Sequence, residues 1–392
     1  MYTSQSPYYR YSRILFGIIY IQSKLAGAFT ISINYKTRLM YKSRSGLIYS
    51  SIVHSFIGCC VFYLIYETHR TSQWGSICGS NKVLCFVKMF DGIVLILVCT
   101  ITYMIDFVSQ DKLIKVANSL GSLNMNYFRD APHPAQRKLF FYVFGKCVNV
   151  LLIMLTHALM TLDAKRDSLS MVFFIAYSMI FNFLEMSVTI IFYVVAVVTK
   201  FYGVTNIKLE KLLHEIKNKS MFSSLNNLEK RTDNIADIYR EIHRIQQDLI
   251  GYYKIHIMGM LLTTFVNSIM KSFHLYVYCL KDEINLRQLN LMVLASVLQC
   301  LDVLFLIHVC AENSDAALKA RRLISRETST YREVDKSLER SLEMLTMQLM
   351  KDKVEYRVGG FYSLNRKFSL VILSSSLMYL IILIQFNYDF EI

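Results

Sequence analysis

The sequence predicts an all-α membrane protein with seven transmembrane helices, a cytoplasmic N-terminus, an extracellular C-terminus and helices that extend into the cytoplasm. Its composition is 54% hydrophobic and only 18% charged, which is too apolar for a soluble chain of 392 residues. Seven apolar runs have the length of about 20 residues that crosses roughly 30 Å of hydrocarbon. Lys and Arg gather in alternate connections between these runs, and this distribution sets the orientation.

The seven apolar runs contain no proline, because Pro7, Pro132 and Pro134 all lie outside them. We therefore expect membrane helices without proline kinks. The fourth run is about 30 residues long, which is more than a bilayer needs, and is expected to tilt or to project into the cytoplasm. The predicted spans are 47–66, 83–105, 139–161, 169–199, 253–280, 288–311 and 366–386.

The positive charges orient the predicted spans. The first 46 residues hold seven Lys or Arg and no acidic residue. The segments 106–138, 200–252 and 311–363 are also basic, whereas the other connections are short and carry few positive charges. The positive-inside rule therefore places the N-terminus in the cytoplasm, and seven spans leave the C-terminus outside.

An eighth apolar stretch, 14–33, precedes the first predicted span. It is interrupted by Gln22, Ser23 and Lys24, and no clear cleavage region follows it. We interpret it as an interfacial or packed helix, with a cleaved or membrane-spanning segment as the alternatives.

Most of the nine cysteines lie inside the predicted spans, where thiols usually pack as small apolar groups. Cys78 and Cys279 differ, because both lie near the predicted outer face. They are a candidate pair, but the sequence establishes no disulfide framework.

Two apolar stripes lie in segments that are predicted to be cytoplasmic. Each stripe has the alternating spacing of three and four residues that marks one face of a helix. We expect the two helices to pack on each other within one subunit or, as the alternative, between subunits. The stripes are Ile235, Ile238, Ile242, Ile245 and Leu249, and Val334, Leu338, Leu342, Leu345 and Leu349.

The sequence shows no signature of enzymatic chemistry. It has no phosphate-binding loop, no paired cysteine motif and no helical metal-protease motif. We therefore expect no catalytic residue, no bound metal and no cofactor. The net charge of +14 follows the membrane topology, so we do not expect a nucleic-acid partner.

Polar side chains at membrane depth are the candidates for function, because burying them in hydrocarbon is costly. Lys146 and Glu185 lie at similar depths and are expected to pair, either as a structural ion pair or as part of a proton or ion relay. Gln299 and Asp302 lie about one turn apart on one face of the sixth span and could meet Lys271 or His274 of the fifth. The other two such residues are His157 and His308.

Aromatic residues in the outer halves of several spans indicate a possible ligand pocket. Such a pocket needs apolar walls and a few convergent polar groups. The alternative is an aromatic belt at the membrane interface, which has the same composition and binds nothing. The predicted pocket residues are His157, Phe173, Tyr177, Lys271, His274, Tyr276, Gln299 and Asp302, and the wider aromatic set adds Phe174, Phe273 and Tyr278.

The end of the last span carries a specific pattern. Tyr379 is followed by the five apolar residues 380–384 and then by Gln385 and Phe386. This resembles the signature of the insect gustatory receptor family, which is threonine and tyrosine, five apolar residues, then glutamine and phenylalanine. Met378 replaces the threonine and removes its hydroxyl. The preceding segment, 360–365, also resembles the one that leads into this helix in that family.

The resemblance implies a ligand-gated, non-selective cation channel of four subunits, in which the seventh helix lines the pore. It implies a small-molecule tastant of the bitter type and contact with membrane lipid. It also implies a homotetramer, or a heterotetramer with related receptors, in the plasma membrane of chemosensory neurons. Tyr379 would set helix packing, while Gln385 and Phe386 would lie at the gate, where an amide faces water and a ring closes the pore. The cytoplasmic helix ends would form an anchor between subunits.

On this basis the chain divides into four parts. These are a cytoplasmic N-terminal segment (1–46), a six-helix ligand-sensing bundle (47–311), a cytoplasmic anchor helix (312–363) and a pore helix with a short outer tail (364–392). Asp389 and Glu391 follow the pore helix. Four copies would place rings of carboxylates at the outer mouth and attract cations, unless the tail is merely solvated.

Two other classes of seven-helix protein are weaker alternatives. A G-protein-coupled receptor would need an extracellular N-terminus, and the charge distribution argues against that orientation. It would also carry Asp-Arg-Tyr at the inner end of the third span and Asn-Pro-x-x-Tyr in the seventh, and this sequence has neither motif. A secondary transporter would favour internal repeats and interrupted helices, and the sequence shows neither signal. Lys146, Glu185 and Asp302 keep that possibility open.

Overall fold

The computed structural model describes residues 7–28, 30–34, 37, 39–70, 82–128, 132–163, 168–217, 225–280, 286–327, 336–351, 354–358 and 362–391. Seven of its helices are long and apolar enough to cross a membrane. They are α2 (Arg44–Arg70), α4 (Lys82–Val108), α6 (His133–Asp163), α7 (Ser168–Lys217), α8 (Leu225–Cys279), α9 (Leu286–Glu327) and α11 (Arg366–Glu391). The predicted all-α fold with seven spans is confirmed.

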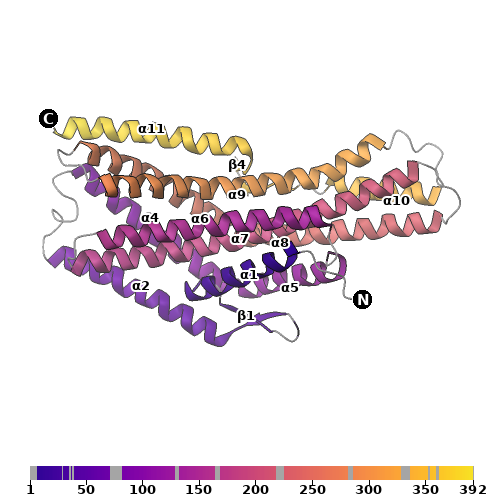
Figure 1. Cartoon of the computed structure of the whole chain (residues 1–392), viewed down its shortest axis with the longest axis horizontal. Helices are drawn as coiled ribbons and strands as arrows, with labels where there is room; N and C mark the ends of the chain where they lie inside the picture. The colour runs from indigo at the N-terminus through magenta and orange to yellow at the C-terminus, as the bar shows by residue number, and fades with distance from the viewer. Residues whose placement is uncertain are drawn as a thin grey trace.

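Three of these helices are much longer than a bilayer. α7, α8 and α9 have 50, 55 and 42 residues. At a rise of roughly 1.5 Å per residue they measure about 75, 82 and 63 Å. All three run along the long axis of the molecule (Figure 1). No proline falls within them, so each continues unbroken from a membrane-spanning segment into an amphipathic extension.

The predicted stripes account for these extensions. Ile242 and Ile245 are buried, as are the other three residues of the first stripe. The second stripe lies on α10 (Lys336–Lys351), where Leu338, Leu342 and Leu345 are buried, while Val334 lies outside the described residues. α10 packs on α8 and α9 of the same chain. The two stripes therefore bury each other within one subunit.

The segment 14–33 forms most of a packed helix, α1 (Pro7–Leu25), and a short strand. α1 lies against α6 and α7 and is not one of the seven candidate spans. The hairpin that follows consists of β1 (Ile31–Ile33) and β2 (Met40–Lys42), paired antiparallel. α5 (Gln110–Tyr127) is a further amphipathic helix, which packs on α8 and contacts β2. A second hairpin, β3 (Arg357–Val358) and β4 (Tyr362–Ser363), precedes α11.

The core is centred on α7, α8 and α9. Its largest cluster includes Phe201, Leu209, Ile242 and Leu306, none of which has measurable exposure. α11 lies along the edge of this bundle (Figure 1) and none of its residues 366–386 is buried. The two chain ends lie in opposite halves of the long axis (Figure 1).

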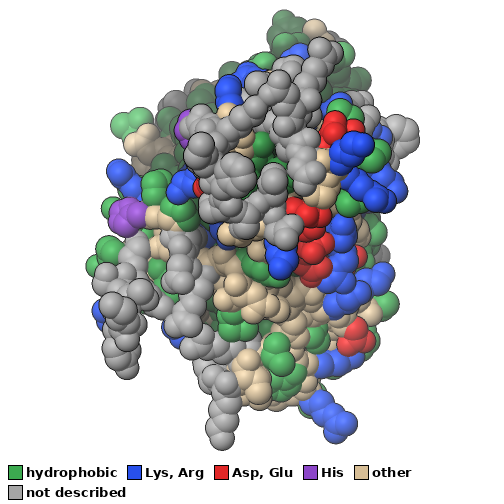
Figure 2. Space-filling view, turned by 90° about the vertical axis from the view of Figure 1, so that its right-hand side faces the viewer, with side chains coloured by type: hydrophobic (Ala, Val, Ile, Leu, Met, Phe, Trp, Pro, Cys, Tyr) green, Lys and Arg blue, Asp and Glu red, His purple; other side chains and the backbone are tan. Residues whose placement is uncertain are grey.

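Charged side chains gather at the end of the molecule that carries α10. Figure 2 shows many Lys and Arg side chains there, with acidic side chains among them. Ion pairs among the described residues of this region include Arg231 with Glu215, Arg240 with Asp237, and Arg244 with Glu241. These pairs are exposed, so they keep the helix ends hydrated and contribute little to stability.

Candidate functional site

A buried ion cluster joins three transmembrane helices. The ammonium of Lys146 on α6 lies 2.9 Å from Oε1 of Glu185 on α7, and it also donates to Oδ1 of Asp302 on α9. Asn149, about one turn along α6, donates to the same Asp302 oxygen at 3.0 Å. The side chain of Lys146 is only 1% exposed. The expected pairing of Lys146 with Glu185 is confirmed.

The partner of Asp302 differs from the prediction. The expected contact with Lys271 or His274 is wrong, because Asp302 binds Lys146 and Asn149 instead. The reason is depth along α8. Asn267 lines the same cavity as Asp302, whereas Lys271 lies one turn further towards the end of that helix. The Nζ atom of Lys271 has no hydrogen-bond partner among the described residues.

The cluster contains two carboxylates and one ammonium. In hydrocarbon, buried ions are stable only when they are paired and hydrogen-bonded. Oδ1 of Asp302 accepts two hydrogen bonds, but Oδ2 is buried and receives none from the part of the chain that the structure describes. The cluster therefore ties α6, α7 and α9 together and leaves one acceptor for a water molecule or a proton.

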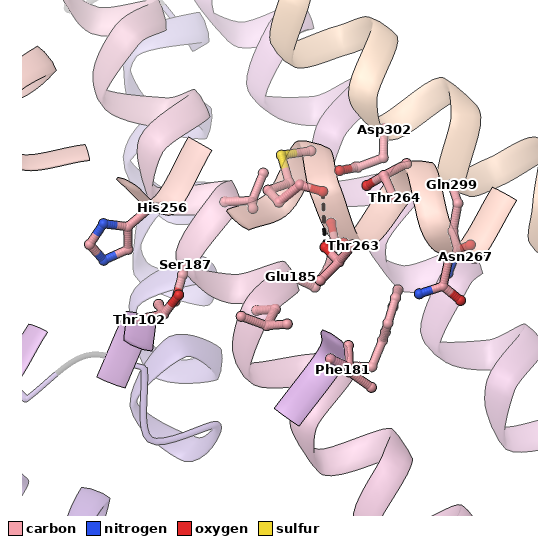
Figure 3. A pocket seen from close by; sticks show the side chains of 14 residues that line it. Thr102, Phe181, Glu185, Ser187, His256, Thr263, Thr264, Asn267, Gln299 and Asp302 are labelled. Carbon is pink, nitrogen blue, oxygen red and sulfur yellow. Dashed lines mark hydrogen bonds between the residues drawn. The ribbon is translucent and has the colours of Figure 1, made fainter. Parts of the chain in front are cut away.

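A small cavity adjoins this cluster (Figure 3). It lies between α4, α7, α8 and α9 and has a volume of about 40 Å³. A single water needs roughly 10–15 Å³ by this measure, so the cavity has room for a few waters and is too small for a tastant. The polar side chains around it include Glu185, Thr263, Thr264, Asn267, Gln299 and Asp302. Carboxylate, hydroxyl and amide groups thus converge at one place in the bundle.

An aromatic cluster lies next to this cavity. The hydroxyl of Tyr177 donates to Oδ1 of Asn267 at 3.1 Å, which joins α7 to α8. The ring of Phe181 lies 4.8 Å from that of His157 on α6 and 6.4 Å from that of Tyr177. Phe181 also lines the cavity. Two predicted pocket residues, His157 and Tyr177, are thus brought together around the ring of Phe181, which is not among the predicted pocket residues.

The other predicted pocket residues are dispersed. Gln299 lines the central cavity, and its Nε2 has no hydrogen-bond partner among the described residues. Tyr276 instead packs in a cluster with Phe273 and α11. The side chains of Phe173 and Phe174 lie outside the described residues, as does Cys78 of the candidate disulfide. Five of the predicted residues are therefore divided between three places, with Gln299 and Asp302 at the cavity, His157 and Tyr177 in the aromatic cluster, and Tyr276 at the contact of α8 with α11.

The seventh helix contacts α8, α9 and α4 along one side. The ring of Tyr379 meets the ring of Phe265 on α8 edge to face at 5.8 Å, and Leu380, Leu383 and Ile384 pack near Phe273. Gln385 and Phe386 are exposed. The side chains of Asp389 and Glu391 lie outside the described residues. More than half of the described side chains of α11 are therefore exposed, while Phe368 and Ile372 pack against the main core.

A buried hydrogen-bond network links the segment before α11 to the core helices. Nε2 of Gln246 on α8 donates to Oδ1 of Asn313 on α9 at 2.5 Å, and Nδ2 of Asn313 donates to Oγ1 of Thr199 on α7 at 3.0 Å. The hydroxyl of Tyr356 donates to the same Asn313 oxygen at 3.2 Å. Burial raises the pKa of Tyr356 well above its usual range, so the phenol stays protonated and able to donate.

The 7tm chemosensory receptor family model matches residues 5–390, which is nearly the whole chain. The chain belongs to this family. This membership identifies it as a chemosensory receptor with membrane-spanning helices, and confirms the prediction that it is not an enzyme. The recognised resemblance to insect gustatory receptors is confirmed by two relatives from Drosophila melanogaster.

The first relative is gustatory receptor 10a, with 22% identity over 275 residues, or 66% of each chain. The second is the gustatory receptor for bitter taste 93a, with 25% identity over 155 residues, or 40% of this receptor and 36% of the relative. The matched region thus spans just under two thirds of the first relative and about a third of the second.

The fold is similar to that of the insect olfactory receptor OR5 from Machilis hrabei. The OR5 structure in complex with eugenol has a TM-score of 0.72 and 13% identity, and the match covers 97% of this receptor and 100% of OR5. The structure of OR5 described without a ligand gives a TM-score of 0.67 over 96% of this receptor and 98% of OR5. At this identity the likeness establishes the fold of the receptor.

Proposed function

We propose that the receptor is a gustatory, bitter-type, ligand-gated and non-selective cation channel. In this proposal four identical or related subunits in the plasma membrane of chemosensory neurons surround a pore lined by α11, with the N-terminus in the cytoplasm. The relative named for bitter taste and the OR5 complex with eugenol support a small organic ligand. The observation that carries the proposal is the unburied face of α11.

Exposure alone would fit a lipid-facing helix, but the polar content of α11 favours a pore. Gln385 and Ser374 are exposed, and Ser375 and Ser376 are half-buried. An amide facing hydrocarbon without a partner costs a few kcal/mol. Copies of α11 from four subunits around a water-filled axis would hydrate these groups, while Phe386 supplies a hydrophobic constriction.

The small size of the central cavity suggests how a ligand would act. A cavity of about 40 Å³ admits a tastant only if α4, α7, α8 and α9 separate. α8 contributes Thr263, Thr264 and Asn267 to that cavity, and it also contacts α11 through Phe265. A ligand that binds the separated helices more tightly would therefore shift α8, and with it α11, towards the open state.

The test is whole-cell current from the receptor expressed alone, with a panel of bitter compounds and sugars. We expect a ligand-evoked cation current whose gating or block changes in Gln385→Ala and Phe386→Ala. Phe56→Ala is the matched control, because Phe56 on α2 is 51% exposed and Phe386 is 53% exposed. A current that changes equally in Phe56→Ala, or that ignores both α11 variants, would contradict the pore assignment.

Two further measurements address the finer parts of the proposal. Epitope tags probed on intact cells should find the C-terminal tag outside and the N-terminal tag inside. Neutralising Asp389 and Glu391 together should lower the cation conductance if their carboxylates surround the outer mouth. Unchanged conductance would mean that this tail is only solvated.

A further inference from the structure

A second cavity lies under α1, away from the central cavity. It has a volume of about 260 Å³ and is enclosed mainly by α1, α5 and α7, with contributions from α6 and α8. It shares no lining residue with the central cavity. Small-molecule pockets usually measure about 300–1,000 Å³, so this cavity is slightly smaller than that range and suits one narrow ligand.

Most of the wall of this cavity is apolar. Leu113, Val116 and Leu120 of α5 face Val194 and Val197 of α7 across it. Gly121, also on α5, borders open space, because a Cβ added there would meet no heavy atom within 4 Å. A hydrocarbon chain in this cavity would make dispersion contacts with these apolar surfaces.

A buried cation lies at the same cavity. Lys200 of α7 is 7% exposed, and its Nζ donates a long hydrogen bond, 3.4 Å, to Oδ1 of Asn124 and lies 5.9 Å from the centre of the Phe201 ring. It makes no ion pair with an acidic residue within the described ranges, and no Asp or Glu lines the cavity. Arg13, an exposed residue of α1, also lines it. Because buried charges are normally paired, this site favours an anion.

Buried hydroxyl groups give a second, independent indication of a polar ligand group. Ser12, Ser23 and Tyr253 line the cavity and are 7%, 0% and 4% exposed. Their hydroxyl oxygens have no hydrogen-bond partner among the described residues. Native proteins rarely leave buried polar atoms unpaired. Water would serve the hydroxyls, but it would neither balance the charge of Lys200 nor gain from the apolar walls.

We propose that this cavity binds a single-chain anionic amphiphile, with a carboxylate or phosphate head at Lys200 and its hydrocarbon chain between α1, α5 and α7. α1 forms one wall of the site, so the bound chain would hold this helix against α6 and α7. The proposal does not depend on channel activity, because binding is measured on the purified receptor.

The experiment is a fluorescence titration of the purified, full-length receptor in uncharged detergent with dansylaminoundecanoic acid. Dodecanoate, dodecyl phosphate, dodecanol and inorganic phosphate are the competitors. We expect saturable binding, displacement by dodecanoate and dodecyl phosphate, and no displacement by inorganic phosphate. Which of the two amphiphiles displaces the probe at lower concentration identifies the head group.

One variant removes the positive charge at the head-group site, and two others fill the cavity. Lys200→Met should weaken binding of the two anionic amphiphiles by about tenfold or more while leaving that of dodecanol unchanged, because only the charge-assisted contact is lost. Gly121→Phe should remove binding of all three by filling the cavity, and Val197→Phe is a second filling variant from α7. Native thermal stability of each variant shows that it has folded.

The matched controls change the same residue types outside the cavity. Lys208→Met removes a positive charge from the same helix, where Lys208 is exposed, and Gly251→Phe adds a ring at an exposed position of α8. Both should bind the probe as the native receptor does. The proposal is overturned if the native receptor shows no saturable binding, if Gly121→Phe and Val197→Phe both bind normally, or if inorganic phosphate displaces the probe. Normal affinity for the anions in Lys200→Met would overturn the anionic head group.

Discussion

α7 and α11 are both long apolar helices, but they occupy opposite environments. In the most apolar window of α7, 61% of the residues are buried in the chain, whereas the corresponding value for α11 is 0%. Mean hydropathy does not distinguish them, because the two windows have values of 2.0 and 2.1. Apolarity thus predicts that a helix enters the membrane, and the arrangement of the other helices decides whether it faces its own chain.

The largest expected difference between the two helices is in stability. Phe201 on α7 is fully buried and stacks on Phe128 at 4.3 Å, so Phe201→Ala should lower the free energy of unfolding by about 3–5 kcal/mol. Phe386→Ala on α11 should change it by less than about 0.5 kcal/mol. Denaturant unfolding in detergent measures both. A large loss in Phe386→Ala would show that α11 is part of the packed core.

A loss of similar size is expected from the ion cluster. Lys146→Met leaves the carboxylates of Glu185 and Asp302 buried without a cation and should cost about 3–5 kcal/mol. The triple variant Lys146→Met, Glu185→Gln, Asp302→Asn should recover most of that stability, since it removes all three charges. If the triple variant is no more stable than Lys146→Met, the loss comes from packing and the ion pair is not its cause.

A smaller effect is expected where α8 approaches α4 closely. A Cβ at Gly259 would lie 2.7 Å from a methyl group of Val98, so Gly259→Ala should destabilise the receptor by about 1–3 kcal/mol. Gly251→Ala is the control, because nothing lies within 4 Å of the corresponding Cβ. Combining Gly259→Ala with Val98→Ala should relieve the overlap. If the single variant is as stable as Gly251→Ala, the two helices separate at little cost.

The smallest effect is expected on the hydrated surface. Arg240 and Asp237 form an ion pair at 2.9 Å, with both side chains about two thirds exposed. Arg240→Ala should change the free energy of unfolding by less than about 1 kcal/mol, and salt should reduce that change further. A greater loss would indicate that this face is covered in the assembled receptor.

The sequence predicted the elements better than the contacts between them. Apolar length and the stripe from Ile235 to Leu249 are local properties, so the spans and the extension of α8 could be predicted. The pairing of Lys146 with Glu185 could be predicted by counting depth along two helices. The partner of Asp302 could not, because it depends on how far α8 is shifted relative to α9, which only packing determines.

Several contacting residues were missed although the sequence held a signal for some of them. Asn149 follows Lys146 by three residues, so it shares the same face of α6. Leu113, Val116, Leu120 and Leu123 have helical spacing and indicate α5. Nothing comparable marks the cavity beneath α1. That cavity arises from the separation of α1, α5 and α7, which no single segment encodes.

The unbroken length of α8 has a mechanical consequence. One rod contacts α4 and α11 in its membrane-spanning part and α10 in its extension. Without a proline hinge it is expected to move as one rigid rod, and a tilt of about 3° about one end of a rod about 80 Å long moves the other end by about 4 Å. A tilt that produces almost no displacement at one end of α8 could therefore be measured at its other end, as a change in the distance between spin labels.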